Sequence, residues 1–151
     1  MNIDAMLSSN SNEWGTPQNL FDELNKEFDF TLDPCSTVEN HKCNKFYTKE
    51  DDGLDRSWKN EIVFVNPPYG REIGKWVEKC YKEFDGNGAT CVMLIPARTD
   101  TSYFHNFIYH KAEIRFIRGR VKFVSFDKEK IVNASAPFPS MIVIFKKHYE
   151  T

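Results

Sequence analysis

Apolar positions along the chain alternate between the spacing of buried strands and that of amphipathic helices. Uninterrupted β-rich runs predict strands at 61–65, 89–95 and 140–145. Between the first two runs, apolar side chains recur at helical spacing from Ile73 to Phe84, which predicts a helix that ends at Gly86-Asn87-Gly88. The order strand, helix, strand indicates an α/β domain.

Weaker patterns surround this central unit. Thr16-Pro17 is typical of the N-cap and first residue of a helix over 17–28, because a threonine oxygen accepts a free amide hydrogen and proline tolerates the first turn. Alternation over 28–32 predicts a short strand that stops at Asp33-Pro34. The other expected elements are a short strand or turn at 45–48, an acidic turn at 50–53, a helix capped by Asp100 or Thr101, a strand at 113–117 and an irregular stretch at 125–139.

The expected fold class is therefore α/β with a largely parallel sheet, connected by right-handed crossovers. Its 151 residues, of which 40% are hydrophobic and 15% aromatic, can bury a core, which excludes a mainly disordered chain. We expect a single domain over 13–151, preceded by a flexible lead-in at 1–12. In such sheets, ligands bind at the carboxyl ends of the strands.

Membrane and metal functions find no support in the sequence. No apolar run approaches the roughly 20 residues that a membrane helix needs, so we expect a soluble protein with no membrane association. The four cysteines form no C-x-x-C pair, which favours reduced thiols. Cys35, His41 and Cys43 lie close in sequence but lack a second ligand pair, so no metal is expected.

Charge is uneven along the chain, although the net charge is only -2. Residues 1–60 hold 6 basic and 12 acidic residues, whereas residues 61–151 hold 14 and 10. Between 111 and 130, seven basic residues outnumber three acidic ones, with phenylalanines interleaved. Such a segment suits the phosphates of a nucleic acid, and the alternative is a strand and turn with solvated charges. The candidate phosphate contacts are Arg115, Arg118, Arg120 and Lys122.

The sharpest chemical signal is Asn66-Pro67-Pro68-Tyr69, directly after the strand predicted at 61–65. Two prolines stiffen this turn and hold the Asn66 side chain and the Pro67 carbonyl as neighbouring acceptors beside an aromatic ring. Two acceptors that hold an exocyclic amine favour a pyramidal nitrogen with a free lone pair, while Tyr69 stacks on the planar ring that carries it. The alternative interpretation is a proline-rich turn with a surface tyrosine.

These four residues resemble the catalytic motif of S-adenosylmethionine-dependent amino-methyltransferases, and more of the chain resembles the phage DNA N-6-adenine methyltransferase family. The segments similar to that family, in its order, are Trp14-Gly15-Thr16-Pro17, Leu32-Asp33-Pro34-Cys35-Ser36, Asp52-Gly53-Leu54 and Arg118-Gly119-Arg120-Val121-Lys122-Phe123. The resemblance spans about residues 13 to 145. It implies a compact class I, Rossmann-like methyltransferase fold that binds S-adenosylmethionine.

The resemblance also implies a cofactor site formed by Trp14, Thr16, Pro17, Asp33, Pro34, Cys35 and Asp52. Amides after Thr16 would receive the cofactor carboxylate, Asp33 would meet its ammonium or ribose, and Asp52 would accept from its adenine amine. For each residue alone, a cap, turn or solvated loop is the alternative. The loop after Asp33 lacks the glycines that usually let backbone approach such a cofactor, and the ribose contacts stay unassigned.

Together with the resemblance, the sequence predicts a phage- or prophage-borne DNA adenine methyltransferase in the cytoplasm of a bacterial host. It would transfer a methyl group from S-adenosylmethionine to the N6 amine of a flipped-out adenine. The alternatives are the same chemistry on protein glutamine, guanine N2 or cytosine N4, and a non-catalytic nucleic-acid or cofactor-binding module. No separate DNA-recognition domain fits in the remaining residues, so specificity is expected from loops or from a homo-oligomer.

Overall fold

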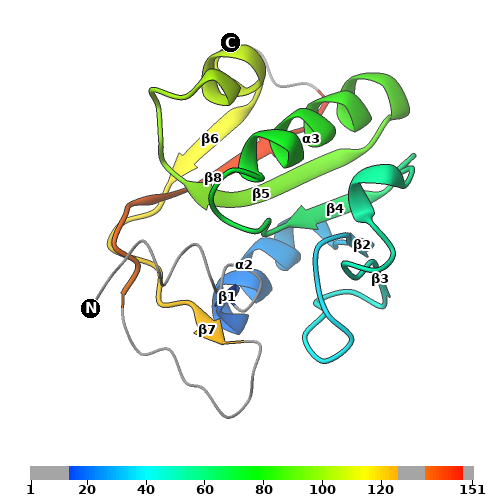
Figure 1. Ribbon diagram of the computed structural model, residues 1–151, viewed down its shortest axis with the longest axis horizontal. Helices are drawn as coiled ribbons and strands as arrows, with labels where there is room; N and C mark the ends of the chain where they lie inside the picture. The colour runs from blue at the N-terminus through cyan, green and yellow to red at the C-terminus, as the bar shows by residue number, and fades with distance from the viewer. Residues whose placement is uncertain (1–13, 126–134, 148–151) are drawn as a thin grey trace.

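The computed structural model describes residues 14–125 and 135–147 (Figure 1). The lead-in expected at 1–12 and most of the irregular stretch expected at 125–139 lie outside these residues. The strands are β1 (Trp14–Gly15), β2 (Leu32–Asp33), β3 (Lys45–Phe46), β4 (Ile62–Val65), β5 (Thr90–Pro96), β6 (Glu113–Phe116), β7 (Val124–Ser125) and β8 (Ser140–Phe145). The helical segments are α2 (Gln18–Phe28), η2 (Gly53–Asp55), α3 (Ile73–Asn87) and η3 (Phe104–Ile108).

Six strands form the main sheet, in the order β3-β2-β4-β5-β8-β6. Strands β3, β2, β4 and β5 pair in parallel, whereas β8 is antiparallel to both of its neighbours, β5 and β6. The expected α/β architecture with a mostly parallel sheet is confirmed. The reversed direction of β8 was not expected, because a continuous apolar run reads the same whichever way its strand points.

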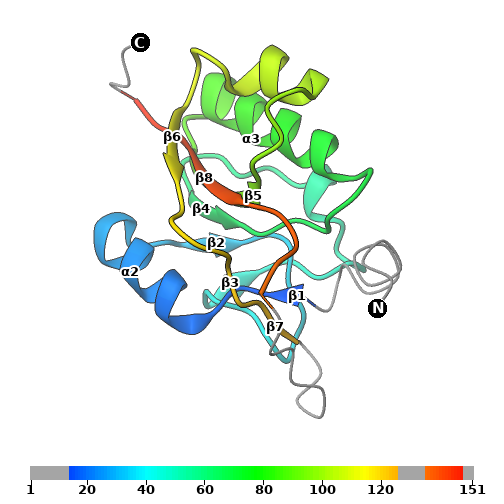
Figure 2. The same cartoon turned by 90° about the vertical axis from the view of Figure 1, so that its left-hand side faces the viewer.

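Helices α2 and α3 cover opposite faces of this sheet (Figure 2). In β4, Phe64 faces α2, where its ring centroid lies 5.2 Å from that of Phe21. In β5, Cys91 faces α3, where it lies beside the buried thiol of Cys80. Alternate side chains of a strand point to opposite faces, so strands covered on both sides must be apolar throughout. This explains why the strands at 61–65 and 89–95 were predictable.

The first helix is capped differently from the sequence prediction. Pro17, not Thr16, is the N-cap residue of α2, and the Pro17 carbonyl accepts hydrogen bonds from the amides of Leu20 and Phe21. The Thr16 hydroxyl instead accepts a hydrogen bond from the side chain of Asn66. The N-cap interpretation of Thr16 is therefore wrong, whereas the helix expected over about 17–28 is present and begins one residue later, at Gln18.

The strand expected over 28–32 is also shorter than predicted. Helix α2 continues to Phe28 and ends at Asp29, whose φ of 55° lies in the left-handed region. The rings of Phe28 and Phe30 are stacked, with centroids 5.6 Å apart. Their two-residue spacing therefore reflects a helix end packed on the residue that follows it. Strand β2 begins only at Leu32.

The other expected elements are present with small shifts in their bounds. Helix α3 ends at Gly88, whose φ of 69° fits the glycine expected at that position. The helix expected near residue 101 is the short π-helical segment η3, and just before it the Thr101 hydroxyl accepts from the Phe104 amide over 3.3 Å. Strands β1 and β7 were not expected, because a two-residue strand carries no periodic pattern. Figures 1 and 2 show them side by side.

Candidate functional site

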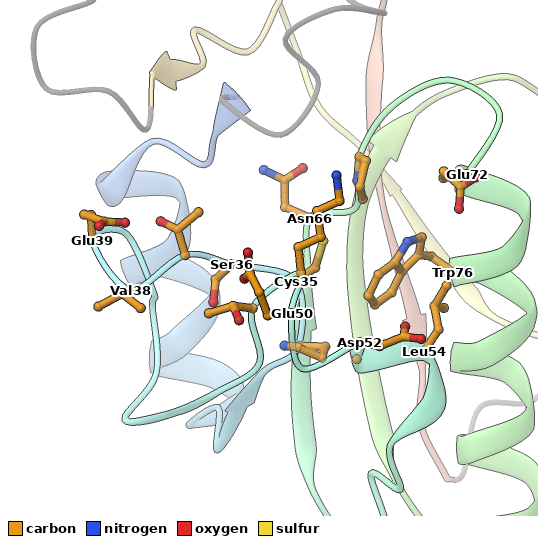
Figure 3. Close-up of a pocket in the computed structure, with 16 residues that line it drawn as sticks. Cys35, Ser36, Val38, Glu39, Glu50, Asp52, Leu54, Asn66, Glu72 and Trp76 are labelled. Carbon is orange, nitrogen blue, oxygen red and sulfur yellow. The ribbon is translucent and has the colours of Figure 1, made fainter.

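A pocket of about 800 Å³ lies at the carboxyl ends of β2, β3 and β4 (Figure 3). Its walls are the loop 34–39 after β2, the turn 48–54 after β3, the start of the loop after β4, and the beginning of α3. These parallel strands end at the same edge of the sheet, which is where α/β proteins bind their ligands. The volume falls within the range of about 300–1,000 Å³ that is usual for small-molecule sites.

The turn after β3 packs tightly against the loop after β2. A Cβ atom at Gly53 would lie 2.2 Å from the Pro34 carbonyl oxygen, so only glycine fits this position. The buried Trp58 indole donates a hydrogen bond to the Gly53 carbonyl over 3.0 Å and so holds the turn against the protein core. Asp52, at a φ of 56°, then stands exposed at the pocket. Glycine at this position thus lets the two walls of the pocket lie in contact.

Asp33 is buried behind one wall of the pocket and does not line the pocket itself. Its side chain is only 4% exposed, and Oδ2 accepts from the Lys42 amide over 2.8 Å. Burial raises the pKa of Asp33 to about 6, although hydrogen bonds from the Lys42 and Cys35 amides act in the opposite direction. The carboxyl group therefore holds the chain at Lys42, just beyond the wall segment 34–39, close to the end of β2.

Carboxylates dominate the electrostatics of the pocket. Glu39, Glu50, Asp52 and Glu72 line it, and Lys49 is the one basic side chain among the described residues that do so. Figure 3 shows Glu39 and Glu72 on opposite sides, with Asn66 between them. An excess of negative charge attracts cationic ligands and repels phosphates. The pocket is therefore suited to a ligand that carries positive charge.

The Asn-Pro-Pro-Tyr segment is divided between the pocket and the core. Asn66 and Pro68 line the pocket, whereas Pro67 and Tyr69 are buried beside it. The Nδ2 atom of Asn66 donates to the Thr16 hydroxyl over 3.1 Å. The end of β4 and the chain just before α2 are thus joined at the pocket rim.

Tyr69 is held inside the protein. Only 6% of it is exposed, its hydroxyl donates to the Leu94 carbonyl over 3.1 Å, and burial raises its pKa. Its ring packs edge to face against Phe123 and Phe138, with centroids 5.6 and 5.7 Å away. The surface-tyrosine alternative is therefore wrong. Stacking of a base on Tyr69 would require Phe123 or Phe138 to withdraw from the ring.

Arg115 is committed to ion pairs within the protein. Its terminal nitrogens bind both carboxylate oxygens of Glu27 on α2, over 2.7 and 2.8 Å, and its Nε donates to Glu113. Bidentate pairs of this kind are the stronger ones among ion pairs. In this structure, Arg115 ties β6 to α2, so the expectation of DNA contact falls mainly on the other three basic residues.

Those three residues, Arg118, Arg120 and Lys122, are exposed. Val121 and Phe123, which alternate with them, are buried. Because Phe123 also packs against Tyr69, the exposed basic side chains belong to a segment in contact with the Asn-Pro-Pro-Tyr turn. The pairing of β1 with β7 brings the same segment beside the chain that leads to Thr16.

The structure thus brings together only some of the predicted cofactor residues. Pro34, Cys35 and Asp52 line the pocket. Of the others, Thr16 contacts the pocket residue Asn66, Pro17 is the N-cap residue of α2, and Trp14 lies in β1.

Several pocket residues were not expected from the sequence. Trp76 lies on the helix face whose periodicity indicates core, and the pattern does not separate core residues from those that also border a pocket. Glu50 was within the acidic turn, where its charge was an available signal. Glu72 directly precedes α3, and nothing in the local sequence indicated that it borders a pocket.

Two absences apply to the described part of the chain. None of its helices has the length and apolar character needed to cross a bilayer. Within residues 14–125 and 135–147, no three His, Cys, Asp or Glu side chains are grouped so that they could hold a metal ion.

Comparison with known proteins identifies the family. Residues 5–151 match the model of the DNA N-6-adenine-methyltransferase (Dam) family, and the chain belongs to that family. The resemblance inferred from the sequence motifs is confirmed.

Two relatives show how far the similarity extends. The chain is 31% identical over 139 residues to a DNA N-6-adenine-methyltransferase of Escherichia phage T1, which covers 81% of this chain and 58% of that protein. It is 36% identical over 70 residues to the putative methyltransferase YfdM of Escherichia coli (strain K12), which covers 42% of this chain and 77% of that protein. The chain thus spans little more than half the length of the phage T1 relative.

Proposed function

We propose that this protein is a DNA adenine methyltransferase that transfers a methyl group from S-adenosylmethionine to adenine N6. The observation that carries the proposal is that Asn66 borders the same pocket as Pro34, Cys35 and Asp52. An amine held by Asn66 would therefore meet a methyl donor held in that pocket. Membership of the DNA N-6-adenine-methyltransferase family supports both the reaction and the substrate.

The residues of the pocket fit S-adenosylmethionine. The cofactor carries a sulfonium and an ammonium charge, which the surrounding carboxylates would offset. Leu54, Val38 and Trp76 offer apolar surface for its nucleoside ring. We assign Asp52 to the adenine amine of the cofactor, and Asp33 to the shape of the wall formed by residues 34–39.

Asn66 would act on the substrate amine. Its amide oxygen and the Pro67 carbonyl would each accept a hydrogen from N6, which favours a pyramidal nitrogen with its lone pair directed into the pocket. When bound, S-adenosylmethionine supplies an electrophilic methyl carbon, so that the nitrogen lone pair forms the N–C bond, the S–C pair stays on sulfur, and the N6 proton leaves to water. We also propose that Tyr69 stacks on the flipped base once Phe123 or Phe138 withdraws.

The finer features of the sequence prediction belong to this proposal. They are the class I, Rossmann-like form of the fold, a single domain over 13–151, action in the cytoplasm of a bacterial host, and target specificity from loops or from a homo-oligomer. A pocket at the carboxyl ends of parallel strands supports the Rossmann-like form.

Transfer of labelled methyl groups tests the proposal. Protein purified from a host without DNA methyltransferases is incubated with labelled S-adenosylmethionine and separate pools of DNA, RNA and protein. We expect label in DNA, and at least about 100-fold slower labelling when Asn66→Ala replaces the parent. Label only in RNA or protein would contradict the substrate, and cofactor binding without any transfer would favour a non-catalytic module.

A charge change in the pocket should weaken cofactor binding. Asp52→Asn keeps the shape and tolerates the left-handed backbone but removes the charge. Loss of a charge-assisted hydrogen bond costs about 1.5–3 kcal/mol, so we expect at least about a 10-fold weaker affinity for S-adenosylmethionine by calorimetry. Asp55→Asn is the matched control, because Asp55 is in the same turn but does not line the pocket. Equal affinities of parent and Asp52→Asn would remove the assignment.

Exposed arginines should set the salt dependence of DNA binding. Arg118→Ala and Arg120→Ala should each weaken binding and reduce the slope of log K against log salt by about one unit per lost phosphate contact. Lys82→Ala serves as the control, because Lys82 is exposed on α3. If both arginine variants keep the slope of the parent, this segment does not contact phosphates.

A further inference from the structure

Thr16 and Asn66 are fifty residues apart in sequence and are joined at the pocket rim. Asn66 Nδ2 donates to Thr16 Oγ1 over 3.1 Å. Thr16 is only 2% exposed, whereas Asn66 is half-buried and lines the pocket. The buried Thr16 hydroxyl therefore contacts Asn66, the side chain that we propose binds the substrate amine.

The backbone holds Thr16 firmly on both sides. Gly15, before it, pairs with Val124 in the β1–β7 sheet. Pro17, after it, is the N-cap residue of α2, and its carbonyl receives the first hydrogen bonds of that helix. Helix α2 has no side-chain cap, so the Thr16 hydroxyl serves the Asn66 amide and not the helix end. Groups fixed in this way on regular elements can hold a functional side chain in one geometry.

We propose that Thr16 is a positioning residue for Asn66. A primary amide has a donor end and an acceptor end and can turn about its terminal torsion. Because Thr16 accepts from the Nδ2 end, it fixes which way the amide faces and directs the Oδ1 end to the other side. The inference rests on the proposed function, since the purpose of this orientation is that Oδ1 accepts from the substrate amine. It differs from the role expected from the sequence, in which the chain at Thr16 binds the cofactor carboxylate.

Single-turnover kinetics distinguish these two roles. Thr16→Val removes the hydroxyl at nearly constant volume and should lower the methylation rate about 10-fold, the scale of one hydrogen bond of about 1.4 kcal/mol. The affinity for S-adenosylmethionine should stay at the parent value, and Thr16→Ser, which keeps the hydroxyl, should recover most of the rate. In an Asn66→Ala background, Thr16→Val should have little further effect, because the two residues act as one unit.

Thr31→Val provides the matched control. The Thr31 hydroxyl accepts from the Ile62 amide over 2.8 Å, at the opposite end of β4 from Asn66. Its removal should lower stability and leave the single-turnover rate unchanged below the unfolding transition. The inference is overturned if Thr16→Val slows the Asn66→Ala variant as much as the parent. It is also overturned if Thr16→Val weakens cofactor binding and leaves the rate unchanged.

Hydrogen exchange at the Asn66 side chain tests the contact without any substrate. The Nδ2 resonances of Asn66 are identified in an NMR spectrum by their loss in Asn66→Ala. Their exchange with solvent should be faster in Thr16→Val than in the parent, and close to the parent in Thr16→Ser. Unchanged exchange in Thr16→Val would overturn the inference. Faster exchange in a protein that methylates no DNA, RNA or protein would contradict the proposed function, and with it the purpose assigned to the contact.

Discussion

Replacement of Asn66 by alanine should slow methyl transfer at least about 100-fold, the scale observed when one preorganised polar group is removed from an active site. The acceptor at Asn66 matters most when the substrate nitrogen becomes pyramidal, so its loss affects the transition state more than the bound ground state. Cofactor affinity and most of the DNA affinity should therefore persist. The rate is measured under single-turnover conditions with saturating S-adenosylmethionine.

Two further variants make this result specific. Asn66→Asp should keep partial activity, because a carboxylate also accepts from the amine and offsets its developing positive charge. Asn19→Ala, at an exposed position of α2, should match the parent. An Asn66→Ala protein as fast as the parent would exclude the proposed mechanism.

Asp33 should give the protein an unusual pH dependence of stability. Burial raises the pKa of Asp33 to about 6 in the folded protein, from an ordinary value of 3.8. The folded state therefore binds this proton more tightly than the unfolded chain does. The contribution of Asp33 to the free energy of unfolding should rise by about 3 kcal/mol as the pH falls through 6 towards 4.

Urea unfolding of the parent and Asp33→Asn between pH 8 and pH 4 measures this effect. The free energy of unfolding of the parent should increase relative to that of Asp33→Asn as the pH falls across this window. Parallel curves would show that Asp33 titrates normally.

Asp51 supplies a control of opposite sign. Hydrogen bonds from the amide and hydroxyl of Thr48 hold the pKa of Asp51 below its usual value. The contribution of Asp51 is therefore present above the unfolded pKa and is lost as the pH falls further. The parent should therefore lose stability relative to Asp51→Asn only below pH 4, so for this pair the urea measurements are extended below pH 4.

The sequence was sufficient for elements whose pattern is local. Buried runs at 61–65 and 89–95 predicted β4 and β5, and helical spacing predicted α3, because each carries its own periodicity. The predicted start of a strand at residue 28 was wrong, because the same alternation of apolar residues arises when Phe28 ends a helix and stacks on Phe30. Patterns of five residues do not distinguish these two cases.

The site was less predictable, because its contacts join distant parts of the chain. The local sequence at Thr16 is typical of a helix N-cap, and only folding brings Asn66 next to its hydroxyl. The basic sequence around Arg115 is typical of a phosphate-binding segment, yet the Arg115 guanidinium forms an ion pair with Glu27, 88 residues away. Local sequence does not reveal a partner supplied by another element. Asn66 could be singled out from its place directly after a buried strand, whereas the role of Asp52 came from the family resemblance.

The most direct test of the central claim is the identity of the methylated nucleoside. DNA that lacks methylated bases is incubated with S-adenosylmethionine and either the parent or Asn66→Ala, then digested and examined by mass spectrometry. The expected result is N6-methyladenine from the parent and at least about a 100-fold lower initial rate of its formation by Asn66→Ala. N4-methylcytosine alone, or equal rates of N6-methyladenine formation by both proteins, would contradict the claim that Asn66 presents adenine N6 to the methyl donor.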